Sequence, residues 1–219
     1  KICLIIDDFG YSENDLIRDF LTLPRDFTVS VIPGHKYSED IAHLAFKYGF
    51  ETILHMPMEQ LDWDGENENT YQLTEQLNFD EVFKRVENAF EEIPSAIGMN
   101  NHQGSKATEN LQLMKDLARS LKKLDKFFID SYTSPESRAF ITMRQFGVKT
   151  EVRQIFLDHQ EHPDSVRQKL NELLKLTEVM EVVVAIGHVK QVTYEILKEE
   201  IPRLKQEGYV FMNASEIVR

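Results

Sequence analysis

Short apolar runs alternate with longer amphipathic segments along the whole chain, and this alternation restricts the fold more than any other feature. The clearest apolar run, 182–188, is almost unbroken, as expected of a strand covered on both sides. The clearest amphipathic segment is 79–93, where apolar residues recur on one side at helical spacing. Strands that alternate with helices of roughly ten or more residues imply crossover connections and a parallel sheet. Seven or eight such units favour an α/β barrel over an open sheet.

The predicted strands cover residues 4–6, 27–32, 52–55, 96–99, 127–130, 148–152, 182–188 and 209–212. The predicted helices cover 12–23, 38–48, 79–93, 109–121, 134–146 and 163–177, followed by one that ends near 206 and a short one near 214. The segment 61–74 lacks periodicity and is expected to cross one face of the domain, where Trp63 and Tyr71 form either a sugar-stacking surface or a lid packed on its own domain. No linker rich in Pro, Gly or Ser is present, so we expect a single domain over 1–219.

The charge of the chain argues against some classes of partner. The formal net charge is −12 at pH 7, which disfavours nucleic acid and a polybasic membrane anchor, because both need Lys and Arg. No run of about 18 apolar residues occurs, so no membrane-spanning segment is expected. The one cysteine, Cys3, cannot form an internal disulfide and leaves the redox compartment open. The chain starts at Lys1, inside a predicted strand and without Met, so we expect a leader or signal peptide to be missing.

Two adjacent carboxylates, Asp7 and Asp8, directly follow the first apolar run and precede Gly10. Side chains alternate across a strand, so we expect these two to point in different directions and to have different roles. Adjacent negative charges beside an apolar core are costly without a cation or hydrogen-bond donors. A turn with a helix cap is the structural alternative, since Asp is a common capping residue.

More His and Asp residues stand at or just beyond the ends of other predicted strands: His55, His102, Asp130, Asp158 and His188. In β/α barrels the carboxyl ends of the strands form one rim, so we expect these side chains to meet there. A carboxylate combined with imidazoles favours zinc (Zn²⁺) or a similar divalent ion, with one position open for water, over magnesium or calcium. Each residue alone could also be an ordinary structural hydrogen-bonder. The other histidines, which are His35, His43, His159 and His162, are treated as background.

Five blocks of the sequence resemble, in order, the motifs of the divergent polysaccharide deacetylases, bacterial cell-envelope proteins distantly related to the NodB-type carbohydrate esterases. The blocks are Ile6-Asp7-Asp8-Phe9-Gly10, His55-Met56-Pro57-Met58-Glu59, Gly98-Met99-Asn100-Asn101-His102-Gln103-Gly104-Ser105, Ile129-Asp130-Ser131 and Ala185-Ile186-Gly187-His188. The resemblance covers essentially the whole chain. It implies a distorted (β/α)7-type barrel of parallel strands, the NodB-like glycoside hydrolase/deacetylase fold, with a metal on its rim.

The resemblance also implies roles for individual residues. In the NodB-type relatives the first Asp of the pair is the general base and the second binds the metal. Asp7 would therefore be the base and Asp8 a metal ligand. The late motif with a terminal His matches His188, which would be the general acid.

The third metal ligand is the point at which the chain departs from those relatives. They carry two ligand histidines four residues apart, whereas here the first position is His55 and the second is Glu59. We expect His102 to restore an Asp-His-His set, with Glu59 accepting a hydrogen bond beside the ligands or coordinating in its place. Three further residues are expected to orient ligands or substrate: Asn101, Ser105 and Asp130.

The resemblance implies metal-dependent hydrolysis of an N- or O-acetyl group on a cell-envelope or extracellular glycan, outside the cytoplasm. One alternative is a metal-containing envelope protein that binds a glycan or a partner without hydrolysing it, because a fold does not fix a function. Another is a metal hydrolase that acts on a phosphodiester. The rim motifs contain no Arg or Lys to hold phosphate, and Lys106 comes closest, which weighs against that alternative. The sequence leaves the glycan, the acetyl position and the oligomeric state open.

Overall fold

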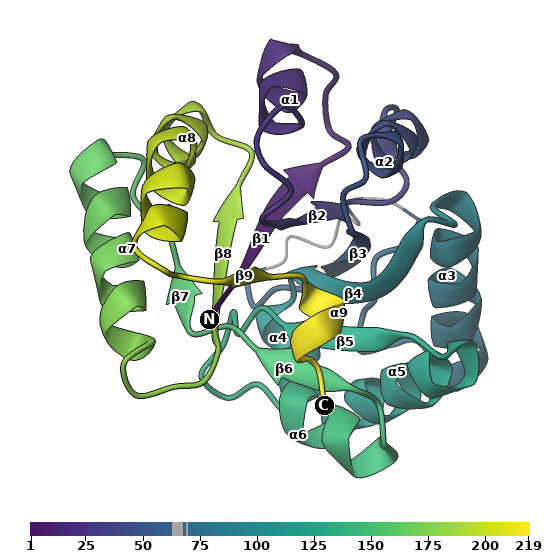
Figure 1. Cartoon of the computed structure of the whole chain (residues 1–219). Coiled ribbons are helices and arrows are strands. Elements are labelled where there is room, and N and C mark those ends of the chain that lie inside the picture. The colour runs from purple at the N-terminus through teal and green to yellow at the C-terminus, as the bar shows by residue number, and fades with distance from the viewer. Residues whose placement is uncertain (63–67, 69) are drawn as a thin grey trace.

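A computed structural model gives the structure of the chain and describes residues 1–62, 68 and 70–219. Within this part, a single sheet of parallel strands curves inside a layer of helices (Figure 1). The strands are β1 (Ile2–Phe9), β2 (Thr28–Val31), β3 (Thr52–Met58), β4 (Ala96–Gln103), β5 (Phe127–Asp130), β6 (Thr150–Val152), β7 (Ile155–Phe156), β8 (Val183–His188) and β9 (Phe211–Met212). Their order is β6-β5-β4-β3-β2-β1-β8-β7, and β9 pairs with β1.

The two edge strands, β6 and β7, follow one another in the chain, separated only by Arg153 and Gln154. Arg153 donates its backbone N–H to the carbonyl of Asp130 on β5, at 2.9 Å. Gln154 donates its backbone N–H to the carbonyl of Val184 on β8, also at 2.9 Å. The chain therefore crosses from one edge of the sheet to the other within two residues, and the sheet forms the expected distorted (β/α)7-type barrel with a seam at this point.

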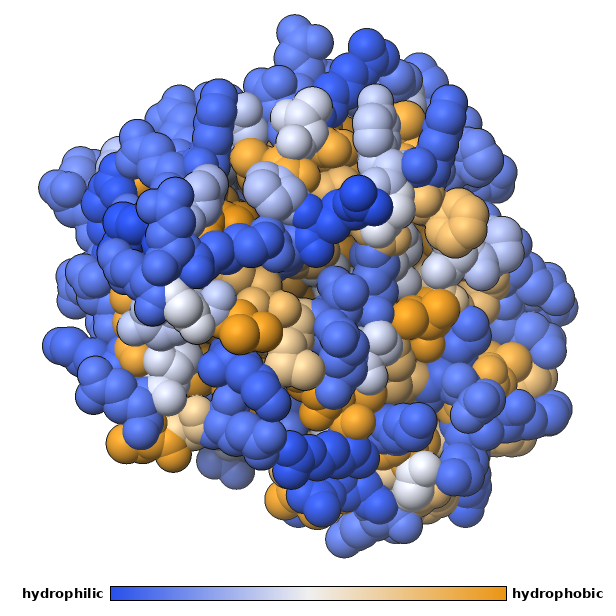
Figure 2. All heavy atoms as spheres, in the orientation of Figure 1, coloured by the Kyte–Doolittle hydropathy of each residue, from blue (hydrophilic) through white to orange (hydrophobic). Residues whose placement is uncertain are grey.

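The helices are α1 (Asp15–Phe20), α2 (Ser38–Lys47), α3 (Phe79–Glu92), α4 (Ser105–Glu109), α5 (Leu111–Leu124), α6 (Ala139–Phe146), α7 (Pro163–Leu176), α8 (Gln191–Gln206) and α9 (Ala214–Ile217). Most lie around the outside of the sheet, whereas the short α9 lies over one end of it, near both termini (Figure 1). The surface in the same view is mostly polar, with scattered apolar patches (Figure 2). Among the described residues, no helix combines the length and apolar character needed to cross a membrane.

Alternation along the strands divides the core into two parts. On β1, Ile2, Leu4 and Ile6 pack in the large cluster between sheet and helices, whereas Cys3 and Ile5 pack in a smaller cluster inside the curve of the sheet. Residues of α9 close the smaller cluster from one end. Because the strand repeat is two residues, the inner face of β1 continues from Ile5 to Asp7. The inner apolar face therefore leads directly to polar side chains at the carboxyl end of the strand.

Gly98, on β4, has to lack a side chain because an added Cβ would lie 2.5 Å from the ring of Phe127. We expect Gly98→Ala to destabilise the protein by about 1–3 kcal/mol, as overpacking of a core does. Chemical denaturation measures this loss. In a Phe127→Leu background the same substitution should cost less, because the shorter side chain leaves room for the methyl group. An equal cost in both backgrounds would contradict this explanation.

Several predicted elements differ from those observed. The two-residue strand β7 was not predicted, and it places Asp158 after β7 rather than after β6. The predicted helix 109–121 corresponds to α5, which begins at Leu111 because the side chain of Asn110 accepts the backbone N–H of Leu113. The short helix α4, which precedes it, was not predicted. The predicted helix 134–146 begins only at Ala139. Trp63 lies outside the described residues, and Tyr71 packs against the large core cluster.

Candidate active site

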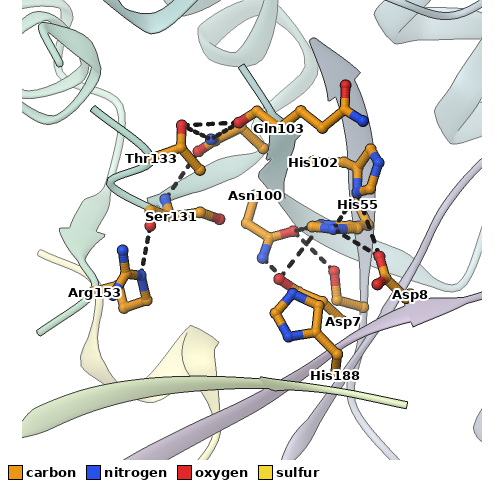
Figure 3. Close-up of polar contacts among 12 residues, drawn as sticks. Asp7, Asp8, His55, Asn100, His102, Gln103, Ser131, Thr133, Arg153 and His188 are labelled. Atoms are coloured by element: carbon orange, nitrogen blue, oxygen red, sulfur yellow. Dashed lines mark hydrogen bonds and ion pairs between the residues drawn. The ribbon is translucent and has the colours of Figure 1, made fainter. Parts of the chain in front are cut away.

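The carboxyl end of β1 is irregular, and this brings both aspartates to one imidazole. Asp8 has a φ of 70°, the left-handed region, and the pairing of β1 with β2 shifts between Ile6 and Phe9. Asp7 Oδ2 lies 3.6 Å from His55 Nδ1, and Asp8 Oδ1 lies 3.4 Å from His55 Nε2. The expectation that the two carboxylates diverge is therefore wrong, because it assumed a regular strand. They instead contact different nitrogens of the same ring (Figure 3).

Asp8, His55 and His102 form a triangle of three potential metal ligands. Asp8 Oδ1 lies 3.3 Å from His102 Nδ1, and His102 Nδ1 lies 3.0 Å from His55 Nε2. A tetrahedral ion with bonds of about 2.0–2.2 Å separates its ligand atoms by about 3.3–3.6 Å. Asp8 Oδ1 is buried, and no donor among the described residues forms a hydrogen bond to it. The two separations from Asp8 fall in this range and the separation of the two imidazole nitrogens is 0.3 Å shorter, so a small outward shift of one ring would let these three atoms bind a divalent ion.

The electrostatics of Asp8 suit a ligand. Burial raises the pKa of its carboxyl group, but the imidazoles of His102 and His55 outweigh burial and hold that pKa well below its usual value. The carboxylate is therefore ionised at neutral pH, as a metal ligand has to be.

Asn100, on β4, determines which nitrogen of His55 faces the triangle. Its Oδ1 lies 2.7 Å from His55 Nδ1 and also accepts the hydroxyl of Ser30 at 2.8 Å. Since this amide oxygen can only accept, His55 carries its proton on Nδ1 and presents the lone pair of Nε2 to the triangle. The Nδ2 group of Asn100 donates to Asp7 Oδ1 at 2.8 Å. One amide thus orients both a potential ligand and the predicted base.

Glu68 supports His102 from the outer side. Glu68 Oε2 lies 3.2 Å from His102 Nε2, and Glu68 Oε1 contacts the Tyr11 hydroxyl and lies 3.2 Å from His35 Nε2. Burial lowers the pKa of His102, but Asp8 and Glu68 outweigh it and raise that pKa to about 9. In the absence of an ion, His102 is therefore protonated at neutral pH, and a metal that binds at Nδ1 has to displace this proton.

Replacing Glu68 by Gln is expected to weaken metal binding by about 10–100-fold, because a carboxylate on the far nitrogen of a ligand histidine fixes its orientation and raises its basicity. Competition with a chromophoric chelator measures the affinity. Glu75→Gln is the matched control, since Glu75 pairs with Lys106 at 2.9 Å and has no contact with the triangle. Equal affinities of the two variants would show that Glu68 does not support the ligand.

His188 ends β8 and forms a pair with Asp158. His188 Nδ1 lies 2.8 Å from Asp158 Oδ1, and Asp158 Oδ2 accepts the backbone N–H of His188 and the hydroxyl of Thr193. Burial lowers the pKa of His188, but Asp158 outweighs it and raises the pKa above its usual value. The predicted acid therefore keeps its proton to higher pH than a free imidazole does.

The substitution Asp158→Asn tests this pair. A group that must be protonated loses its function as the pH rises through its pKa, so a raised pKa extends activity toward high pH. Without the charge of Asp158, the alkaline limb of kcat/KM against pH should move to lower pH, while the metal content stays the same. An alkaline limb at the original pH would show that His188 is not the group that titrates there.

Two other predicted residues, Glu59 and Ser105, lie outside the triangle. The Glu59 carboxylate is buried, and it accepts Lys106 Nζ at 2.6 Å and the backbone N–H of Glu75 at 2.9 Å. Its hydrogen bonds go to Lys106 and Glu75 and not to His55 or His102, so the geometry favours neither predicted role of Glu59. Ser105 Oγ accepts the backbone N–H of Leu61 and anchors the segment that follows β3.

Asn101 and Asp130 organise the loop after β5. Asn101 Oδ1 accepts the backbone N–H of Ser131 at 2.9 Å. Asp130 Oδ1 accepts the backbone N–H of Tyr132 at 2.9 Å, and its Oδ2 accepts the Ser137 hydroxyl at 2.7 Å. Both side chains shape one wall of the site and do not reach the triangle.

A cavity of about 210 Å³ opens beside the triangle. Its lining includes both predicted proton-transfer residues and comes from the rim at β1, β3, β4, β5, β7 and β8 and from the seam: Asp7, His55, Asn101, His102, Gln103, Ser131, Thr133, Arg153, Phe156, Ile186 and His188. A larger hollow of about 710 Å³ between α2 and α3 contains neither the triangle nor its partners. We place the candidate active site at the smaller cavity, because there the titratable groups converge.

Sequence reasoning missed three members of this site. Asn100 had a usable signal, because it stands two residues before His102 and so shares its face of β4. Glu68 had no such sequence signal, because it lies in the segment 61–74, which lacks periodicity. Its partner His35 was treated as background. Arg153 was missed because the seam was not predicted.

The curved parallel sheet with its outer helices has the NodB-like fold of solved family 4 carbohydrate esterase structures. The model of the divergent polysaccharide deacetylase family matches residues 4–218, and the chain belongs to that family. The chain is 31% identical to the protein YibQ of Escherichia coli K12 over 204 residues. That match covers 93% of this chain and 63% of YibQ, so the chain spans less than two thirds of that relative.

Solved structures share the fold at low identity. Protein ATU2773 of Agrobacterium tumefaciens superposes with a TM-score of 0.93 at 16% identity, over 99% of this chain and 88% of that one. BA3943 of Bacillus anthracis, described as a CE4 family pseudoenzyme, gives 0.59 at 15% identity, over 99% and 64%. The peptidoglycan N-acetylglucosamine deacetylase Bc1960 gives 0.54 at 14% identity, over 99% and 87%. The fold thus occurs in both a deacetylase and a pseudoenzyme.

Proposed function

We propose that the chain is a metal-dependent carbohydrate deacetylase that hydrolyses an N- or O-acetyl group on a glycan. The observation that carries this proposal is the arrangement of Asp7 and His188 on the cavity that borders the triangle of Asp8, His55 and His102. Oxygen and imidazole nitrogen donors at this spacing suit zinc. The extracytoplasmic location, the cell-envelope glycan and the single domain stay predictions.

In this proposal Asp8 Oδ1, His55 Nε2 and His102 Nδ1 hold the ion. A bound ion would supply Lewis-acid chemistry to the acetyl carbonyl and the attacking water. Asp7 accepts the proton of the attacking water, and its Oδ1 is held by the amide of Asn100. His188 donates a proton to the departing amine or sugar oxygen, and Asp158 keeps that imidazole protonated and oriented.

The test is acetate release by the purified protein from acetylated chito-oligosaccharides and from an O-acetylated polysaccharide. We expect release by zinc-loaded protein, loss of release after chelation, and recovery when the metal is restored. The Asp7→Asn variant serves as the control for a contaminating esterase. No release from either substrate by metal-loaded protein would contradict the proposal.

A second candidate is a metal-containing protein that binds glycan without hydrolysis. This candidate is favoured by the departure at position 59, where the chain has Glu instead of the second ligand histidine of the NodB-type relatives. The Glu59 carboxylate pairs with Lys106 and so does not replace that histidine. Binding of intact acetylated oligosaccharide to zinc-loaded protein, without acetate release, would support this candidate.

A further inference from the structure

Arg153 is the only Arg or Lys among the described residues that line the cavity. It lies in the seam between β6 and β7, on the opposite side of the cavity from Asp8 (Figure 3). Its position depends on the barrel closing, since its backbone N–H bonds to Asp130 on β5. The cavity therefore has one permanent positive charge in its wall.

The guanidinium of Arg153 is held rigidly by one edge. Its Nε donates to the carbonyl of Ser131 at 2.6 Å, and its Nη2 donates to the carbonyl of Tyr132 at 2.9 Å. Its face lies over the ring of Phe156, 5.2 Å from the centroid. A guanidinium has five N–H donors, so the remaining edge keeps donors for a ligand.

No carboxylate among the described residues forms an ion pair with Arg153. Asp7 and Asp130 act on it only through space, and burial lowers the pKa of its guanidinium. A partly buried charge without a contacting counter-ion is costly, whereas an anion bound in the cavity would offset that cost. The unpaired edge is thus free to donate to an anion in the cavity.

We propose that Arg153 binds a carboxylate on the sugar that bears the acetyl group, so that the preferred substrate is an acidic glycan. This inference rests on the proposed function. Phe156 separates Arg153 from His188, with 5.0 Å between the centroids of Phe156 and His188. A carboxylate held by Arg153 would therefore lie on the same side of the cavity as His188. A lone guanidinium matches a monoanionic carboxylate in a bidentate pair better than a phosphate, which carries up to about two charges.

The first test compares chito-oligosaccharides with the same oligosaccharides oxidised at C6, where a carboxylate replaces the hydroxymethyl group. We expect kcat/KM to favour the oxidised substrate, and the ratio of the two values to fall about 10–100-fold in Arg153→Met, as loss of a charged hydrogen bond implies. If Arg153→Met acted only by weakening the loop after β5, kcat/KM would fall equally for both substrates and their ratio would stay unchanged. Arg144→Met is the matched control, because Arg144 also lies over a phenylalanine ring, that of Phe140, but is exposed and outside the cavity. An unchanged ratio in Arg153→Met, or no preference in the wild type, overturns the inference.

The second test needs no turnover and separates this inference from the proposed function. Glucuronate and glucose are titrated against chelated protein, so that no ion can bind the carboxylate, and NMR shifts give the dissociation constants. We expect glucuronate to bind at least about tenfold more tightly than glucose, and Arg153→Met to remove the difference. If that holds while no acetate is released, the anion site stands and the deacetylase proposal fails. If glucuronate binds no better than glucose, the anion site is wrong even in an active deacetylase.

Discussion

Replacing Asp7 by Asn is expected to lower kcat by about 10²–10⁴-fold while the metal content stays the same. Asp7 is 1% exposed and is not one of the three potential ligands. Its Oδ1 accepts the amide of Asn100, and an Asn side chain has the same shape there but cannot take a proton from water. The turnover and the zinc content of the same preparation have to be measured together.

Asp116→Asn is the control for the loss of a buried aspartate. Asp116 lies on α5, where its carboxylate contacts Gln112 and Arg119. That variant should keep its activity. Unchanged turnover in Asp7→Asn would remove Asp7 from the mechanism, whereas loss of zinc along with activity would make Asp7 a part of the metal site.

Replacing His102 by Ala is expected to weaken zinc binding by more than about 100-fold. Loss of a residue that only supports a ligand, such as Glu68, costs up to about 100-fold. The substitution removes one corner of the triangle and leaves only two protein ligands, Asp8 and His55. Chelator competition and metal analysis of the purified variant measure the effect.

Glu59→Gln decides between the two predicted third ligands. Because Glu59 is bonded to Lys106 and to the backbone of Glu75, its substitution should reduce stability while zinc affinity stays close to the wild-type value. If Glu59→Gln lost zinc and His102→Ala kept it, the geometry of the triangle would not describe the metal site.

The rim of the barrel could be predicted because strand alternation is a local property. Once 52–55 and 182–188 are read as strands, His55 and His188 must end them on the same side of a parallel sheet. The same reasoning failed at Asp8, because the left-handed φ there interrupts the alternation and turns a second carboxylate into the site. Among residues 7–10, only Gly10 indicates that the strand becomes irregular here.

Long-range contacts account for the rest of what was missed. Glu68 reaches His102 across the rim, and Arg153 reaches the cavity only because the two edge strands come within two residues of each other. Neither position has a periodic pattern around it. Lys106, the cation that comes closest to the rim motifs in the sequence, is instead paired with Glu59 and Glu75.

The side chain of Asn100 has a consequence for how this protein can change over evolution. The same carboxamide restrains one imidazole and one carboxylate at once. In the proposed mechanism, a replacement at this position would alter metal retention and proton abstraction together, so selection could not adjust either property alone there. A replacement of Asn100 would therefore call for compensating substitutions at Ser30, Asp7 or His55, which share its hydrogen bonds.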